Sequence, residues 1–173
     1  MTITEEIFKN IERTEPHLAL FIEFYSTLNL SPATAVEVTC DQINRSKRSL
    51  RIPGEVERTI PLHLLNKIPP LSKYPNFFHL FTSVEEPDLW ELNTRNKLDF
   101  FEVLLEDFRP STGTNIRLKS FRHHFLRLSY FRIKQEANTK CEAIEYFGKT
   151  VGIQDRKELS NFLDSKGILE YSE

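Results

Sequence analysis

The stretch AVEVTCDQINRSKRSLRIPGEVERTIPLHLLNKI, residues 35–68, decides the fold because the hydrophobic pattern changes its period there. Polar residues at 41–46 predict a turn. Short runs of alternating apolar and polar residues at 49–52 and 56–60, separated by Pro-Gly, are typical of two strands joined by a turn. A proline at the start of 61–65 then predicts a short helix. This stretch therefore predicts a small antiparallel hairpin or meander.

The segments on both sides of this hairpin carry apolar residues at helical spacing. Before it, residues 5–31 predict two helices, and Pro16 starts the second. After it, KLDFFEVLLEDF (97–108) predicts an amphipathic helix. Further helices are expected at 87–92, 117–133, 138–147 and 155–165. We therefore predict an α+β fold that is mainly helical with a small antiparallel sheet, in a single domain over residues 1–173.

Composition excludes several classes of function. The 173 residues carry a net charge of -2, so binding to nucleic acid or to an anionic membrane would need local clusters of Lys and Arg. No apolar run approaches the roughly 20 residues that span a bilayer, so no membrane partner is expected. Two separate cysteines and an acidic N-terminus predict a reduced, cytoplasmic location, or the nucleoid or nucleus if the chain binds DNA.

No cofactor and no metal are expected. The five histidines are scattered, without the i, i+4 pair and nearby carboxylate of a helical zinc site, and the five glycines form no phosphate-binding loop. Cys40 and Cys141 are expected to be small buried hydrophobes. Trp90 and the phenylalanines within 77–81 and 100–101 are assigned to the core.

The strongest charge segregation lies between residues 116 and 134, which hold no acid. An apolar stripe of this helix must face the core, so Lys119 and Arg122, three residues apart, can lie together beside it. Arg and Lys side chains at such spacing suit a nucleic-acid backbone. The expected DNA-binding residues are Lys119, Arg122, Arg117 and Arg127 with a second cluster, Arg45, Lys47 and Arg48, in the predicted hairpin. The alternative is a solvated surface whose cations pair with neighbouring Glu and Asp.

The order of these elements resembles the catalytic domain of the tyrosine recombinases, the phage-integrase family. Within residues 18–62, VTCDQIN resembles the family's LxWxDId stretch and ERTIPL its strand end, R-x-(I/V)-P-L. LKSFRHHF (118–125) resembles the box in which a His or Lys precedes an Arg by three residues, and AIEYFGKT (143–150) resembles the LLGHS box. The similarity covers most of the chain in consistent order. It implies a recombinase-like fold and duplex DNA as the partner.

The resemblance also implies that the family's active site is degenerate in this chain. The first family Arg falls on Ser31, the hairpin Lys on Glu55 and the nucleophilic Tyr on Glu158. In this family a Tyr hydroxyl attacks the phosphodiester while Arg and Lys stabilise its charge, and losing one such donor typically costs about 10²–10³ in rate. A cation remains only at the vestigial positions Lys119, Arg122 and Lys149. The residues before Leu18 are too few for the family's N-terminal clamp domain, so that domain is expected to be absent.

We therefore expect a DNA-binding protein derived from a recombinase, without strand cleavage. One alternative is an active integrase that uses a relocated Tyr171 or a Tyr from another subunit; Tyr146 lies in an apolar helical pattern and is interpreted as core or support. The other is a protein-interaction module, with a protein partner or a second copy of the chain, that no longer binds DNA. The negative net charge and the acid at position 55 favour this last alternative.

Overall fold

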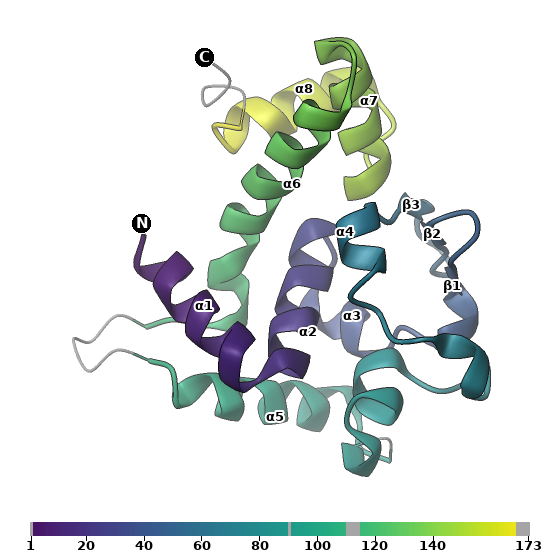
Figure 1. The fold of residues 1–173 in the computed structure, drawn as a ribbon, viewed down its shortest axis with the longest axis vertical. Helices are drawn as coiled ribbons and strands as arrows, with labels where there is room; N and C mark the ends of the chain where they lie inside the picture. Colours follow the sequence, from purple (N-terminus) through teal and green to yellow (C-terminus); the bar gives the residue numbers. More distant parts are fainter. Residues whose placement is uncertain (1, 90, 110–114, 169–173) are drawn as a thin grey trace.

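The computed structural model of the protein describes residues 2–89, 91–109 and 115–168. It is mainly helical with one small sheet, which confirms the coarse fold class (Figure 1). The helices are α1 (Ile3–Thr14), α2 (Pro16–Thr27), α3 (Pro32–Val36), α4 (Leu62–Leu65), α5 (Thr94–Glu106), α6 (Arg122–Glu136), α7 (Lys140–Val151) and α8 (Arg156–Ser165). The strands β1 (Ile43–Asn44), β2 (Ser49–Leu50) and β3 (Arg58–Thr59) form an antiparallel sheet in the order β1-β2-β3.

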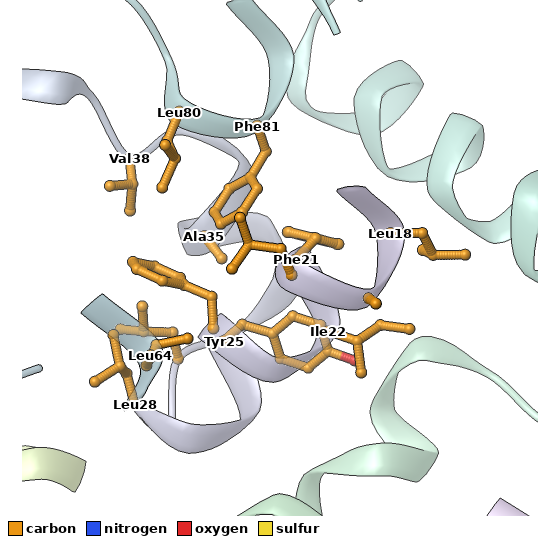
Figure 2. Packing of buried hydrophobic residues seen from close by; sticks show 14 of the residues in the cluster. Leu18, Phe21, Ile22, Tyr25, Leu28, Ala35, Val38, Leu64, Leu80 and Phe81 are labelled. Carbon is orange, nitrogen blue, oxygen red and sulfur yellow. The ribbon is translucent and has the colours of Figure 1, made fainter. Parts of the chain in front are cut away.

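Helix α2 forms the centre of the main core (Figure 2). Every residue from Leu18 to Thr27 is buried, as expected for a helix that is apolar around most of its circumference, and the one charged residue of this stretch, Glu23, is buried with the rest. Phe21 stacks on Phe101 of α5 with ring centroids 4.3 Å apart, and Phe24 meets Phe81 edge-on at 5.1 Å. Helices α1, α5 and α6 pack around α2. The functional surfaces described below therefore rest on a rigid central helix.

A second hydrophobic cluster holds the C-terminal part of the chain. The C-terminal half of α6 packs against α7 and α8, away from α2 (Figure 1). Its buried members are Leu126, Tyr130, Ile133, Ala143, Phe147, Val151, Leu159, Leu163 and Ile168. Gly152 ends α7 in the left-handed conformation, with φ 76°, which glycine adopts without strain. This turn lets α8 fold back on α7.

Four details differ from the expectations. Residues 43 and 44 pair with β2 as β1, although their polar surroundings predicted a turn. The helix expected to begin at 117 begins at Arg122, after a 3₁₀ turn at Leu118–Phe121. Phe77 is 66% exposed and Cys141 is exposed, so both were wrongly assigned to the interior. Residues 87–89 form only a short 3₁₀ turn, and Trp90 lies outside the described residues.

Candidate nucleic-acid interface

Two arginines from distant parts of the chain hold the turn between α2 and α3. The Arg58 Nε–H of β3 donates to the Leu28 carbonyl at 2.9 Å, and Arg122 Nη2 at the start of α6 donates to the Leu30 carbonyl. Asn29 between these carbonyls has φ 52°, a left-handed conformation that Asn tolerates better than most residues. The two guanidinium groups satisfy carbonyls that follow the C-terminal end of α2.

The Arg58 side chain joins three elements at this turn. It is 11% exposed, and its Nη1 lies 2.8 Å from Glu55 Oε2 and donates to the Val56 carbonyl at 3.0 Å. Strand β3 also packs against α7. A Cβ at Gly152 would lie 3.1 Å from Arg58 Cζ, so the glycine allows the end of α7 to approach the guanidinium. The hairpin, the α2–α3 turn and the end of α7 therefore meet at Arg58.

Three of the positions matched to the recombinase active site, Ser31, Glu55 and Arg122, lie at this turn or contact a residue that binds it. Ser31 follows the carbonyl that Arg122 binds, and Glu55 pairs with the arginine that binds Leu28. Lys149 lies in the last turn of α7, where its side chain is 60% exposed and pairs with Glu145 at 3.0 Å. The sequence spacing of these positions did not by itself require them to be neighbours in space.

Two of the positions at which this chain lacks the family's residue have local roles in helix capping. The Ser31 hydroxyl accepts a hydrogen bond from the Thr34 N–H at 3.0 Å and so caps α3. Glu158 lies in the first turn of α8, is exposed, and donates its N–H to Asp155 at 2.8 Å. Neither side chain offers a cation or the tyrosine hydroxyl that serves as the family's nucleophile. Tyr171, the relocated nucleophile of the integrase alternative, lies outside the described residues.

Lys119 and Arg122 were expected to lie side by side on the surface, but they have different environments. Lys119 is exposed, as is Arg117, whereas Arg122 is half-buried and turned towards the α2–α3 turn. The buried Tyr25 hydroxyl donates to the Leu118 carbonyl and fixes the 3₁₀ turn that carries Lys119. Burial raises the pKa of Tyr25, so this hydroxyl keeps its proton as a donor. Lys119 is thus presented on a rigid turn.

The cations of the hairpin cluster also have different environments, because one binds the backbone and two face solvent. Arg45 Nη1 donates to the carbonyl of Ile68 at 3.0 Å and thereby ties the hairpin to the segment after α4. Lys47 and Arg48 are exposed at the turn between β1 and β2. Tyr146 of α7 is half-buried; burial raises its pKa, and the positive charge of Arg48 opposes this rise. Strand β3 of the same sheet packs against α7.

Arg127 lies apart from the other predicted DNA contacts. At about 100° per residue, it projects about 140° around α6 from Arg122. It lines a groove between α6 and the first turn of α1 instead. Within the described ranges, no three His, Cys, Asp or Glu side chains are grouped closely enough to hold a metal ion, and no helix there is long and apolar enough to cross a membrane.

The sequence interpretation missed Arg58, the residue that organises this site. Its signal was present, because Arg58 is the first residue of the strand end R-x-(I/V)-P-L. Arg58 was assigned to the motif, but no structural role was predicted for its side chain. Comparisons with protein-family models, with curated proteins and with solved structures found no match to this chain. Membership of the tyrosine recombinases therefore stays a prediction, carried by the motifs and by their convergence at the α2–α3 turn.

Proposed function

We propose that the protein binds duplex DNA without cleaving it, as a DNA-binding domain derived from a tyrosine recombinase. The observation that carries this proposal is the convergence of Ser31, Glu55 and Arg122 on the α2–α3 turn. These positions are 24 and 67 residues apart along the chain, and each lies at this turn or is linked to it by an arginine, which supports the proposal. Such agreement between motif order and spatial arrangement is not expected from a chance match of short patterns.

Exposed cations on either side of this turn supply the attraction to phosphate. Lys47 and Arg48 project from the hairpin, and Arg117 and Lys119 flank the start of α6. The hairpin and the start of α6 lie on opposite sides of α2 (Figure 1). Lys and Arg that neutralise phosphates release counterions, which gives affinity without base recognition. We infer a salt-sensitive and largely sequence-independent interaction.

The contacts of the former catalytic positions argue against strand cleavage. Arg122 is bound to a backbone carbonyl and Glu55 to Arg58, so neither is available to a phosphodiester. A carboxylate at position 55 would repel the phosphate that a Lys would attract. Glu158 replaces the nucleophile. The described positions matched to the family therefore supply neither the tyrosine of the covalent route nor most of the electrostatic stabilisation that cleavage requires.

The test is fluorescence anisotropy of a labelled duplex over a series of salt concentrations. The informative variant carries Lys47→Gln, Arg48→Gln and Lys119→Gln, all at exposed side chains, so that the fold is preserved. A control removes two other exposed cations, with Arg13→Gln on α1 and Arg95→Gln on α5. Each phosphate contact contributes about 0.9 to the slope of log K against log salt, so the triple variant should lose about 2–3 from that slope.

Binding that is absent at low salt, or equal in the triple variant and the control, would refute the DNA proposal and favour a protein-interaction module. The integrase alternative is tested separately with a nicked suicide duplex that traps a covalent adduct. An adduct that disappears in Tyr171→Phe would refute the non-cleaving proposal and identify the nucleophile. Intact duplex binding without an adduct is the expected result.

A further inference from the structure

A groove of about 600 Å³ runs along the face of α6 that points away from the α2–α3 turn. Its floor is one stripe of α6, formed by His123, Arg127, Phe131 and Lys134, and Ser120 of the preceding 3₁₀ turn lines the same groove. At about 100° per residue, the four helical positions fall within about 80° of the helix circumference. Residues of the first turn of α1 form one wall, and Ile168, after α8, lies at the other. The groove is thus separate from the proposed duplex interface.

The charge of the groove favours an anionic ligand. Arg127 and Lys134 line it together with His123 and His124, whereas Glu5 is the one acid among its described lining residues. Glu5 is already engaged, because it accepts a hydrogen bond from the Thr2 N–H at 2.8 Å and lies 3.5 Å from His124 Nδ1. Two fixed positive charges, Arg127 and Lys134, therefore line the groove against one negative charge.

An exposed aromatic ring lies between the two fixed cations. Phe131 is 52% exposed, although it belongs to a helix whose opposite side is buried. At a rise of 1.5 Å per residue, Phe131 lies about 6 Å along the axis from Arg127 and about 4.5 Å from Lys134. Alternation of cations with an exposed ring along a groove is the arrangement with which proteins bind single strands, because phosphates pair with the cations and bases stack on the ring.

We propose that this α6 groove binds a short stretch of single-stranded nucleic acid. A base stacks on Phe131 while the flanking phosphates approach Arg127 and Lys134. Both cations already make an interaction within the chain, and the phosphates replace that interaction when the strand binds. Binding is therefore salt-sensitive and of moderate affinity. Duplex DNA does not fit this mode, because its bases are not free to stack on a side chain.

The test is anisotropy of a labelled oligothymidylate of about ten nucleotides, a length within the usual site sizes. Phe131→Ala should weaken binding about 5- to 150-fold, since base stacking is typically worth about 1–3 kcal/mol. The matched control is Phe77→Ala, because Phe77 is the other strongly exposed phenylalanine among the described residues, at 66%. Arg127→Gln with Lys134→Gln should lower both the affinity and the salt dependence. Equal thermal melts establish that the variants remain folded.

Three outcomes would overturn the proposal. These are no binding of the oligothymidylate at low salt, equal losses in Phe131→Ala and Phe77→Ala, or displacement of the oligonucleotide by poly-glutamate at matched charge, which would assign the groove to an acidic peptide. The result is independent of duplex binding. The triple variant at Lys47, Arg48 and Lys119 should retain single-strand binding, whereas Phe131→Ala should retain duplex binding.

Discussion

Glu23 is the buried charge on which the packing of α2 against its neighbours depends, and its replacement by Gln gives the sharpest test of the fold. The carboxylate is 2% exposed and lies 2.6 Å from Lys67 Nζ, 3.6 Å from Arg132 Nη1 and 3.8 Å from His63 Nε2. Removing one partner of a fully buried pair costs about 3–5 kcal/mol. Lys67 and Arg132 are 41% and 38% exposed, so in Glu23→Gln they can turn towards water.

The loss then reduces to one charge-assisted hydrogen bond, about 2 kcal/mol. For a chain of this size, that corresponds to a fall of about 4–8 °C in Tm, which urea denaturation and a thermal melt would measure. Glu12→Gln is the matched control, because Glu12 lies 3.2 Å from the same Lys67 Nζ but is 52% exposed. It should change stability by less than about 0.5 kcal/mol. Equal losses in the two variants would refute the argument from burial.

Burial and neighbouring cations lower the pKa of His63 from its usual 6.5 to about 4. As the pH falls from 6.5 towards 4, this histidine therefore takes up a proton only in the unfolded chain, and the free energy of unfolding decreases. Urea titrations should show a smaller loss over this range in His63→Gln. Gly148→Ala places a methyl group 2.7 Å from a leucine methyl of α8 and should cost about 1–3 kcal/mol in chemical denaturation, despite the helix preference of Ala. Gly152→Ala should melt lower than Gly54→Ala, because both have positive φ but only the former meets Arg58.

Local sequence signals predicted much of the secondary structure. Pro16 begins α2, and the apolar stripe of residues 97–108 became α5, with Phe101 and Leu105 fully buried. The positions of β2 and β3 were predicted correctly, whereas β1 was predicted as a turn, and the regular pairing covers only two residues of each strand. Phe77 was wrongly assigned to the core because an apolar run does not show which of its side chains point inwards. The backbone turns within this run, and Phe77 faces solvent.

The candidate site was harder to predict because its key contacts join distant segments. Arg58 of β3 binds the carbonyl of Leu28, which lies 30 residues earlier in the chain. Arg122 and Lys119 have the same spacing as the recombinase box, yet one binds a carbonyl and the other is exposed. Residue type and spacing identify which groups could bind phosphate. Only the packing of the elements decides which of them face solvent.

The two arginines at the α2–α3 turn hold the backbone in place, so they can be present in a protein that does not cleave DNA. Arg58 and Arg122 both donate to carbonyls of the α2–α3 turn, and Arg58 is also neutralised by Glu55. Replacing Glu55 by Gln removes a negative charge near the proposed duplex but leaves both carbonyl contacts in place. Surface charges are worth about 0.2–1 kcal/mol, so Glu55→Gln should tighten duplex binding about 1.4- to 5-fold without producing a covalent adduct. Anisotropy on the labelled duplex measures the first effect, and an unchanged or weaker affinity would mean that DNA does not approach this turn.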